Sequence, residues 1–141
     1  MPSAESLTVP GTPAGLRQAL DFFERFGEAH DVPRGSRWRV RLAVDEILSN
    51  VIRFAHDSAD NAVDMTFTFD AGVMSVEIVD AADAFNPLLA PRPDTTSALL
   101  DRQPGGLGLL LVRRLMDETL YERRDDRNHL VLKCGPDHAD R

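Results

Sequence analysis

Apolar and polar residues alternate over residues 63–70 and again over residues 74–78, and this alternation constrains the fold more than any other feature of the chain. The odd positions from 63 to 69 are apolar with Asp or Thr between them, and after Ala71-Gly72 the even positions 74, 76 and 78 are apolar. Successive side chains of a strand point to opposite faces, so each segment has one buried and one solvated face. A tight turn at Ala71-Gly72 would join the two segments into an antiparallel hairpin.

Two segments ahead of the hairpin carry the spacing of amphipathic helices, and a short edge strand over residues 6–10 would precede them. We expect the helices over about residues 14–30 and 33–56, because Pro33 suits a first helical turn. Apolar residues recur in both helices at the intervals that form one buried face. In the second helix these residues are Val40, Ala43, Val44, Ile47, Val51, Phe54 and Ala55.

The regular pattern stops after the hairpin and returns near the C-terminal end. Residues 88–104 contain three prolines and no sustained period. An irregular segment of this length inside a compact domain is usually functional or disordered. A further helix is expected over about residues 106–116, and strands over residues 118–124 and 128–133 with a hairpin turn at residues 125–127.

The chain of 141 residues is long enough for one domain, which we expect over residues 1–134 with a flexible tail over residues 135–141. Its net charge of −7 argues against direct binding to nucleic acid or to anionic membranes, since both need clustered Lys and Arg. No signal-peptide pattern and no membrane-spanning apolar run are present, which predicts a cytoplasmic protein. The single cysteine, Cys134, excludes an intramolecular disulfide, and we expect it at the frayed end of the last strand.

The long second helix carries a polar stripe of Glu46, Asn50 and Arg53 at the border of its apolar face. An Asn oxygen is a hard ligand that suits Mg²⁺, and a carboxylate one turn away could deprotonate a nucleophile. The alternative interpretation of this segment alone is an exposed polar stripe with a Glu-Arg pair.

Asp80 ends the apolar face of the second hairpin strand and is followed by Phe85-Asn86-Pro87. A carboxylate on a buried face must find a hydrogen-bond donor, and the exocyclic amine of adenine would be one. Alternatively, Asp80 caps the following turn through its own backbone.

The segment Gly105-Gly106-Leu107-Gly108-Leu109 stands at the expected start of a helix. Free backbone N–H groups at a helix N-terminus attract anions, and glycine lets the main chain approach a phosphate closely. Taken alone, the glycine cluster is weak evidence for a phosphate site, since it matches neither the P-loop nor the Rossmann pattern.

The order of these three segments is more specific than any one of them, and it resembles that of the GHKL, or Bergerat-fold, ATPases. Within that superfamily the chain is most similar to the anti-sigma-factor serine/threonine kinases, over residues 39–133. Residues 41–50 resemble the N box, and residues 105–117 resemble the second glycine box. The resemblance implies an α+β, two-layer domain with helices on one face of a mixed, mostly antiparallel sheet. It also implies ATP bound under a lid, here residues 88–104.

The resemblance also implies roles for individual residues. Glu46 would be the general base, Asn50 would hold Mg²⁺, and Asp80 would bind the adenine amine. Arg53 would be a phosphate neighbour by its helix position. The remaining nucleotide-binding positions would be Ala82, Phe85, Gly105, Gly106, Leu107, Gly108 and Leu109.

The first glycine box departs from the superfamily pattern, because alanines at positions 82 and 84 replace the two usual glycines. If Ala82 had to adopt a positive φ, the backbone strain would cost about 1–2 kcal/mol. The retained Phe85-Asn86-Pro87 favours a variant of the box.

The leading hypothesis is a kinase that phosphorylates a small anti-sigma-factor antagonist of the STAS type, with a sigma factor or another effector as its second partner. A binding module that regulates by sequestration, without phosphotransfer, is the alternative that the altered glycine box motivates. A histidine-kinase fragment is disfavoured, since no phosphoacceptor helix precedes the domain. Homodimerisation is possible, because the first strand would present a free sheet edge.

Overall fold

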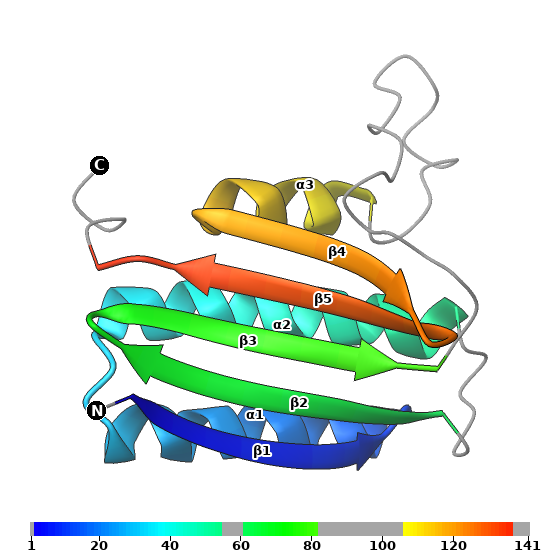
Figure 1. The fold of residues 1–141 in the computed structure, drawn as a ribbon, viewed down its shortest axis with the longest axis horizontal. Coiled ribbons are helices and arrows are strands. Elements are labelled where there is room, and N and C mark those ends of the chain that lie inside the picture. Colours follow the sequence, from blue (N-terminus) through cyan, green and yellow to red (C-terminus); the bar gives the residue numbers. More distant parts are fainter. Residues whose placement is uncertain (1, 55–60, 82–105, 137–141) are drawn as a thin grey trace.

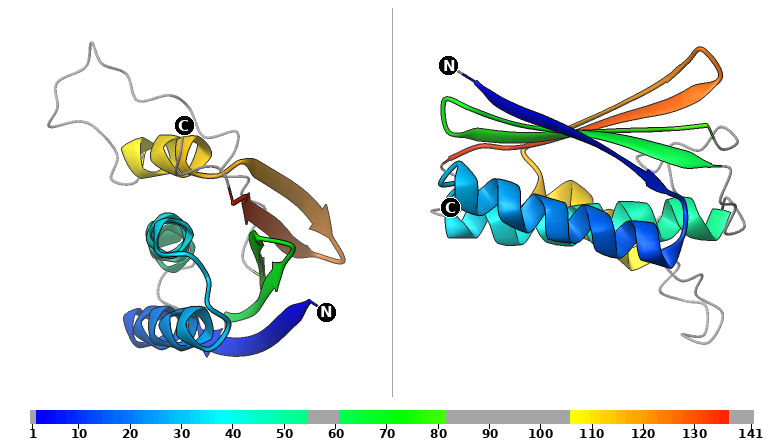
Figure 2. Two further views of the ribbon diagram at one scale, coloured as in Figure 1. Left: turned by 90° about the vertical axis from the view of Figure 1, so that its left-hand side faces the viewer. Right: turned by 90° about the horizontal axis from the view of Figure 1, so that it is seen from below.

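The computed structural model describes residues 2–54, 61–81 and 106–136, which form two layers (Figure 1). Five strands make one sheet in the order β1-β2-β3-β5-β4, and all four neighbouring pairs are antiparallel. The described helices lie together on one face of this sheet, as Figure 2 shows. The α+β sandwich expected from the sequence is therefore confirmed.

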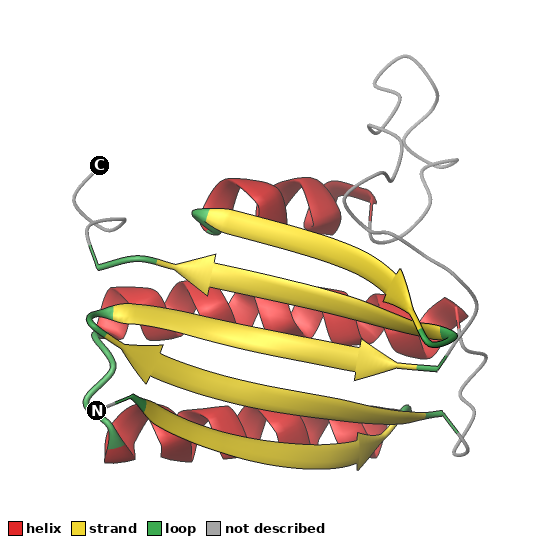
Figure 3. Cartoon of the chain, viewed as in Figure 1, coloured by secondary structure: helices red, strands yellow, loops and turns green. Residues whose placement is uncertain are grey.

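The elements agree closely with the sequence pattern (Figure 3). The strand expected over residues 6–10 starts three residues earlier and forms an edge of the sheet, as anticipated. The expected end of the second helix, at residue 56, lies outside the described residues. In chain order the elements are β1 (Ser3–Pro10), α1 (Pro13–Ala29), α2 (Arg34–Phe54), β2 (Ala62–Asp70), β3 (Val73–Asp80), α3 (Gly106–Leu115), β4 (Glu118–Arg124) and β5 (Arg127–Cys134).

Both hairpins close through two residues with left-handed backbone angles. The φ angles are 52° at Ala71 and 81° at Gly72, and 54° at Asp125 and 60° at Asp126. Two-residue turns of this kind match the right-handed twist of the flanking strands. The turn expected over residues 125–127 is one residue too long, since Arg127 already pairs within the ladder.

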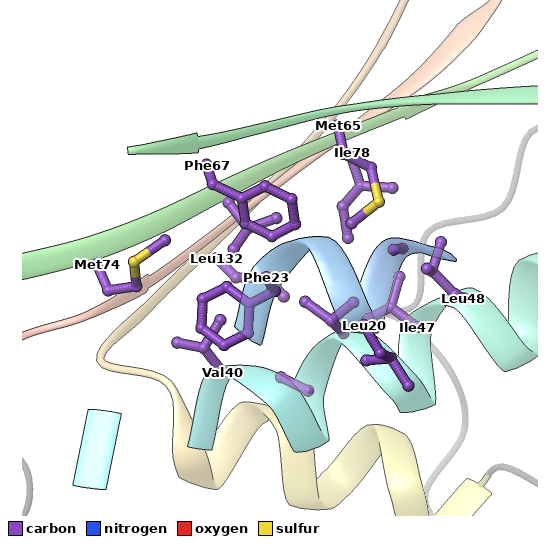
Figure 4. Packing of buried hydrophobic residues seen from close by; sticks show 14 of the residues in the cluster. Leu20, Phe23, Val40, Ile47, Leu48, Met65, Phe67, Met74, Ile78 and Leu132 are labelled. Atoms are coloured by element: carbon purple, nitrogen blue, oxygen red, sulfur yellow. The ribbon is translucent and has the colours of Figure 1, made fainter. Parts of the chain in front are cut away.

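The core lies between the sheet and the helices, with aromatic rings at its centre (Figure 4). Phe67 of β2 is fully buried, and its ring centroid lies 5.4 Å from that of Phe23 and 5.6 Å from that of Phe22, both on α1. From α2 the predicted apolar face supplies buried Val40 and Ile47. Among the described helices, none is both long and apolar enough to cross a membrane.

Gly15 fixes the way in which α1 leaves β1. A Cβ at this position would lie 1.9 Å from the carbonyl oxygen of Pro10, so only glycine fits. The side-chain oxygen of Thr12 accepts the Gly15 N–H at 3.2 Å, and Pro13 occupies the first helical position. This cap and the close approach hold α1 against the end of β1.

Cys134 is the last residue of β5, as expected, but the expectation that this strand end is frayed is wrong. Its side chain is 0% exposed and belongs to the core, because it continues the inward series of Leu130 and Leu132 on β5. Burial raises the pKa of the Cys134 thiol, and the Asp117 carboxylate adds to this, while a hydrogen bond with Ser36 and the charge of Arg39 oppose it.

The buried thiol leads to a pH-dependent prediction. Because the folded-state pKa of Cys134 is raised, the neutral thiol stabilises the fold below the unfolded pKa of about 8.5, and this contribution is lost as pH rises through the folded pKa. Between the unfolded and the folded pKa the unfolding free energy of the wild type should therefore fall more steeply with rising pH than that of Cys134→Ala, as measured by urea unfolding. Parallel pH dependence of the two proteins would contradict the assignment.

Candidate functional site

The ends of several elements meet at one end of the sheet. The strand register brings Val63 of β2, Asp80 of β3 and Asn128 of β5 into one row, with Arg123 of β4 beside Asn128. The C-terminus of α2 and the N-terminus of α3 lie at this same end (Figure 1). Polar side chains from segments far apart in the sequence are thus brought together here.

Asp80 is the last residue of β3 and is 4% exposed. Its Oδ1 accepts a hydrogen bond of 3.1 Å from the side-chain amide of Asn128, which is 5% exposed. The expectation that this carboxylate lies on the buried face and needs a donor is confirmed, and a donor from the protein is Asn128.

Asn128 is held from its other side by β4. Its Oδ1 accepts from the hydroxyl of Tyr121 at 2.5 Å and from the guanidinium of Arg123 at 3.2 Å. Sequence reasoning missed all three residues. The signal was available in part, because the alternation of Asn128 with Leu130 and Leu132 places the Asn side chain on the inward face.

Asn61 ties the start of β2 to the end of β3. Its Oδ1 accepts the backbone N–H of Ala81 at 3.2 Å, so the first N–H after Asp80 is bound by Asn61. The Nδ2 of this buried side chain has no hydrogen-bond partner within the described part of the chain. Asn61 is a second buried amide that the sequence analysis did not identify.

The stripe on α2 is only partly exposed. Asn50 is 2% exposed, its Nδ2 donates to the backbone carbonyl of Glu46 at 2.7 Å, and its Oδ1 accepts from Arg53 at 3.3 Å. Glu46 is half-buried and Arg53 is exposed. The alternative of an exposed polar stripe is therefore wrong for Asn50.

The opposite flank of α2 shows which way this stripe faces. Arg41 forms an ion pair of 2.9 Å with Glu24 of α1. At about 3.6 residues per turn, Asn50 lies on the side of α2 opposite to Arg41. Since α2 lies between α1 and α3 (Figure 2), the stripe lies on the flank toward α3.

The helix α3 begins at Gly106, where the glycine cluster predicted it. Gly106, Leu107, Gly108 and Leu109 therefore form its first turn, where backbone N–H groups lack intrahelical partners and favour an anion. Among the candidate residues, Ala82, Phe85 and Gly105 lie outside the described residues, as does the expected lid. No group of three or more His, Cys, Asp or Glu in the described ranges is placed to hold a metal ion.

Comparison with known proteins gives concordant results. The profile of the histidine kinase-like ATPase domain matches residues 9–134. The serine/threonine-protein kinase BtrW of Bordetella bronchiseptica is 36% identical over 97 residues, which are 68% of this chain and 68% of BtrW.

Two solved structures share the fold. The RsbU and RsbW domains of Rv1364c from Mycobacterium tuberculosis match with a TM-score of 0.65 and 12% identity, over 94% of this chain and 32% of that one. The SiaB–SiaC complex from Pseudomonas aeruginosa matches with a TM-score of 0.58 and 15% identity, over 92% and 88%. At these identities the structural matches establish the fold alone.

The profile covers nearly the whole described chain, and its description implies ATP as the ligand. The kinase relative agrees with the family that the order of the three sequence segments indicated. The chain therefore belongs to the histidine kinase-like ATPase domain family.

Proposed function

We propose that this chain is a serine/threonine protein kinase that transfers the γ-phosphate of ATP to a small STAS-type antagonist protein. It would act in a cytoplasmic partner-switching system, with a sigma factor or another effector as its second partner. The observation that carries the proposal is the pair of buried polar side chains, Asp80 and Asn50, at the end of the sheet where α3 begins. The kinase name of the relative BtrW supports it.

The nucleotide would lie between α2 and α3. Asp80 is a buried carboxylate already held as a hydrogen-bond acceptor, which suits the exocyclic amine of adenine. The first turn of α3 would bind the phosphates through backbone N–H groups of Gly106 to Leu109. Ala82, Phe85 and Gly105 complete the proposed contacts on sequence grounds.

Asn50 would supply the protein oxygen for Mg²⁺, which takes most of its ligands from water and phosphate and would neutralise phosphate charge. The Oδ1 of Asn50 now accepts a long hydrogen bond of 3.3 Å from the exposed Arg53. A guanidinium on a flexible, exposed side chain can move from this oxygen to a phosphate. The same pair of residues therefore fits both the metal and the phosphates.

Glu46 would act as the general base. The partner's serine hydroxyl would attack the γ-phosphorus, its proton would pass to the Glu46 carboxylate, and the bond to the β-phosphate oxygen would break to release ADP. Glu46 is one turn from Asn50 on the same flank of α2, so the base and the phosphates would be neighbours.

The direct test incubates the protein with Mg-ATP and its antagonist and searches for phosphoserine by mass spectrometry. Transfer of phosphate to the antagonist is expected. The second candidate function, regulation by sequestration, is favoured by the alanines at positions 82 and 84. ADP binding without any phosphotransfer would support sequestration and overturn the kinase proposal.

Nucleotide binding by Asp80 leads to a separate prediction. Asp80→Asn replaces one acceptor oxygen by an amide donor, so the affinity for ADP should fall by about 10–100-fold, as measured by calorimetry. Asp64→Asn is the matched control, because Asp64 lies on the neighbouring strand and pairs with Thr8 and Arg127 on the outer face. Equal ADP affinity of Asp80→Asn and wild type would remove Asp80 from the site.

A further inference from the structure

A chain of hydrogen bonds crosses three strands behind Asp80. Tyr121 and Arg123 of β4 both donate to the Oδ1 of Asn128 on β5, and the Nδ2 of Asn128 donates to Asp80 on β3. All four side chains project from the face of the sheet that the helices cover. The chain therefore ends on the carboxylate that faces the proposed nucleotide.

The chemistry of the two ends determines the orientation of the amide between them. A guanidinium can only donate hydrogen bonds, and an ionised carboxylate can only accept them. Only one orientation of Asn128 satisfies Arg123 and Asp80 together: its oxygen toward β4 and its NH₂ toward β3. The flipped amide would place its oxygen against the carboxylate and its NH₂ against the guanidinium, and burial of Asn128 makes such mismatches costly.

We propose that Tyr121 and Arg123 are positioning residues that confer the preference for a 6-amino purine over a 6-oxo purine, by holding Asn128 and through it Asp80. This inference rests on the proposed nucleotide site. A carboxylate held in place against the 6-position gains a hydrogen bond there only from a base that carries a 6-amine. A 6-oxo base presents an acceptor at this position, and its N1–H donor lies one ring atom away, where a carboxylate held against the 6-position is not aimed.

The differential effect on two nucleotides separates positioning from general destabilisation. In the double variant Tyr121→Phe/Arg123→Met, the affinity for ADP should fall about tenfold, the size of one hydrogen bond. The affinity for inosine diphosphate should change by less than about twofold, because that nucleotide offers no donor at the 6-position, where Asp80 is held. Calorimetry with both nucleotides measures the ratio of affinities. If the double variant folds poorly, Tyr121→Phe alone can be measured in its place. It removes a single hydroxyl and should show the same trend.

Arg124→Met is the matched control on the same strand. The Arg124 side chain points to the other face of the sheet, where its guanidinium lies 3.5 Å from Glu122 and 3.3 Å from a ring nitrogen of His129. The variant loses the same charge without touching Asn128. Its ratio of ADP to inosine diphosphate affinity should equal that of the wild type.

A second readout needs no nucleotide. In ¹⁵N NMR spectra of the free protein, the side-chain amide protons of Asn128 should exchange with solvent about tenfold faster in the double variant than in wild type or Arg124→Met. If the double variant lost no affinity for ADP, or lost the same affinity for both nucleotides, the positioning role would be overturned and the proposed function would stay intact. If the wild type bound neither nucleotide, the proposed function would fail, and this inference would fail with it.

Discussion

Glu46→Gln should lower the rate of phosphotransfer to the antagonist by about 10²–10⁴-fold, the usual contribution of a positioned general base. Glutamine keeps the size and the hydrogen-bonding capacity of the side chain but cannot accept a proton from the attacking hydroxyl. Glu46 is half-buried on the flank of α2 that carries Asn50, whose side chain donates to the backbone carbonyl of Glu46. That backbone bond is untouched by the substitution, so the local helix geometry should persist.

Single-turnover transfer from radiolabelled ATP measures this effect. Calorimetry with ADP should give an affinity within about twofold of wild type, because the substitution removes an interaction that is made only in the transition state. Asp45→Asn is the control. Asp45 is the neighbouring carboxylate on α2, accepts a hydrogen bond of 3.3 Å from Ser49, and lies about 100° around the helix from Glu46. Its removal should leave the transfer rate unchanged. Full activity of Glu46→Gln, or an equal loss in Asp45→Asn, would refute the assignment of Glu46 as base.

Phe67→Ala should reduce the free energy of unfolding by about 3–5 kcal/mol, because it removes a large side chain and leaves a cavity. Phe67 is 0% exposed, and its ring lies within 6.0 Å, between centroids, of three phenylalanine rings of α1. Those rings are carried by one helix, which can move only as a unit. The cavity should therefore collapse incompletely, which places the loss in the upper part of the range.

Urea unfolding followed by circular dichroism measures the change, with the slope of the transition checked against wild type. Phe69→Ala is the matched control, since Phe69 is two residues further along the same face of β2 but only partly buried at the rim of the core. Its loss should be clearly smaller. A loss below about 1 kcal/mol for Phe67→Ala would contradict the central place given to this ring.

The helices and hairpins could be predicted because their signals are local. The alternation around Ala71-Gly72 and the helical spacing of Val40, Val44 and Ile47 each lie within one element. The extension of β1 to Ser3 could not be predicted, because Ser3, Ala4 and Glu5 are polar or small and join the sheet only through pairing with β2. The burial of Cys134 could have been predicted, because the alternation of β5 directs the thiol inward even at the last residue of the strand.

The candidate site was predictable only in part, for the same reason. Asp80 and Asn50 could be found from their positions within one strand or helix. Asn128 is 48 residues from Asp80 in sequence, and only the register between β3 and β5 brings the two side chains together. Asn61 likewise reaches Ala81 through the pairing of β2 with β3. The alternation within a strand can show which face a side chain lies on. The partner that it meets there depends on the register between distant strands, which leaves no local signal in the sequence.

The direction of the strands has a consequence for how this domain can be linked to others. Ser3, Phe69, Met74 and Cys134 share a row at the end of the sheet opposite to the row of Asp80 and Asn128. The described chain thus enters and leaves the sheet at the end remote from the site. A fusion partner, purification tag or immobilisation tether attached at either side of the domain would leave the proposed nucleotide site open. Surface-coupled binding measurements can therefore use either attachment point, and they should give the same affinity from both.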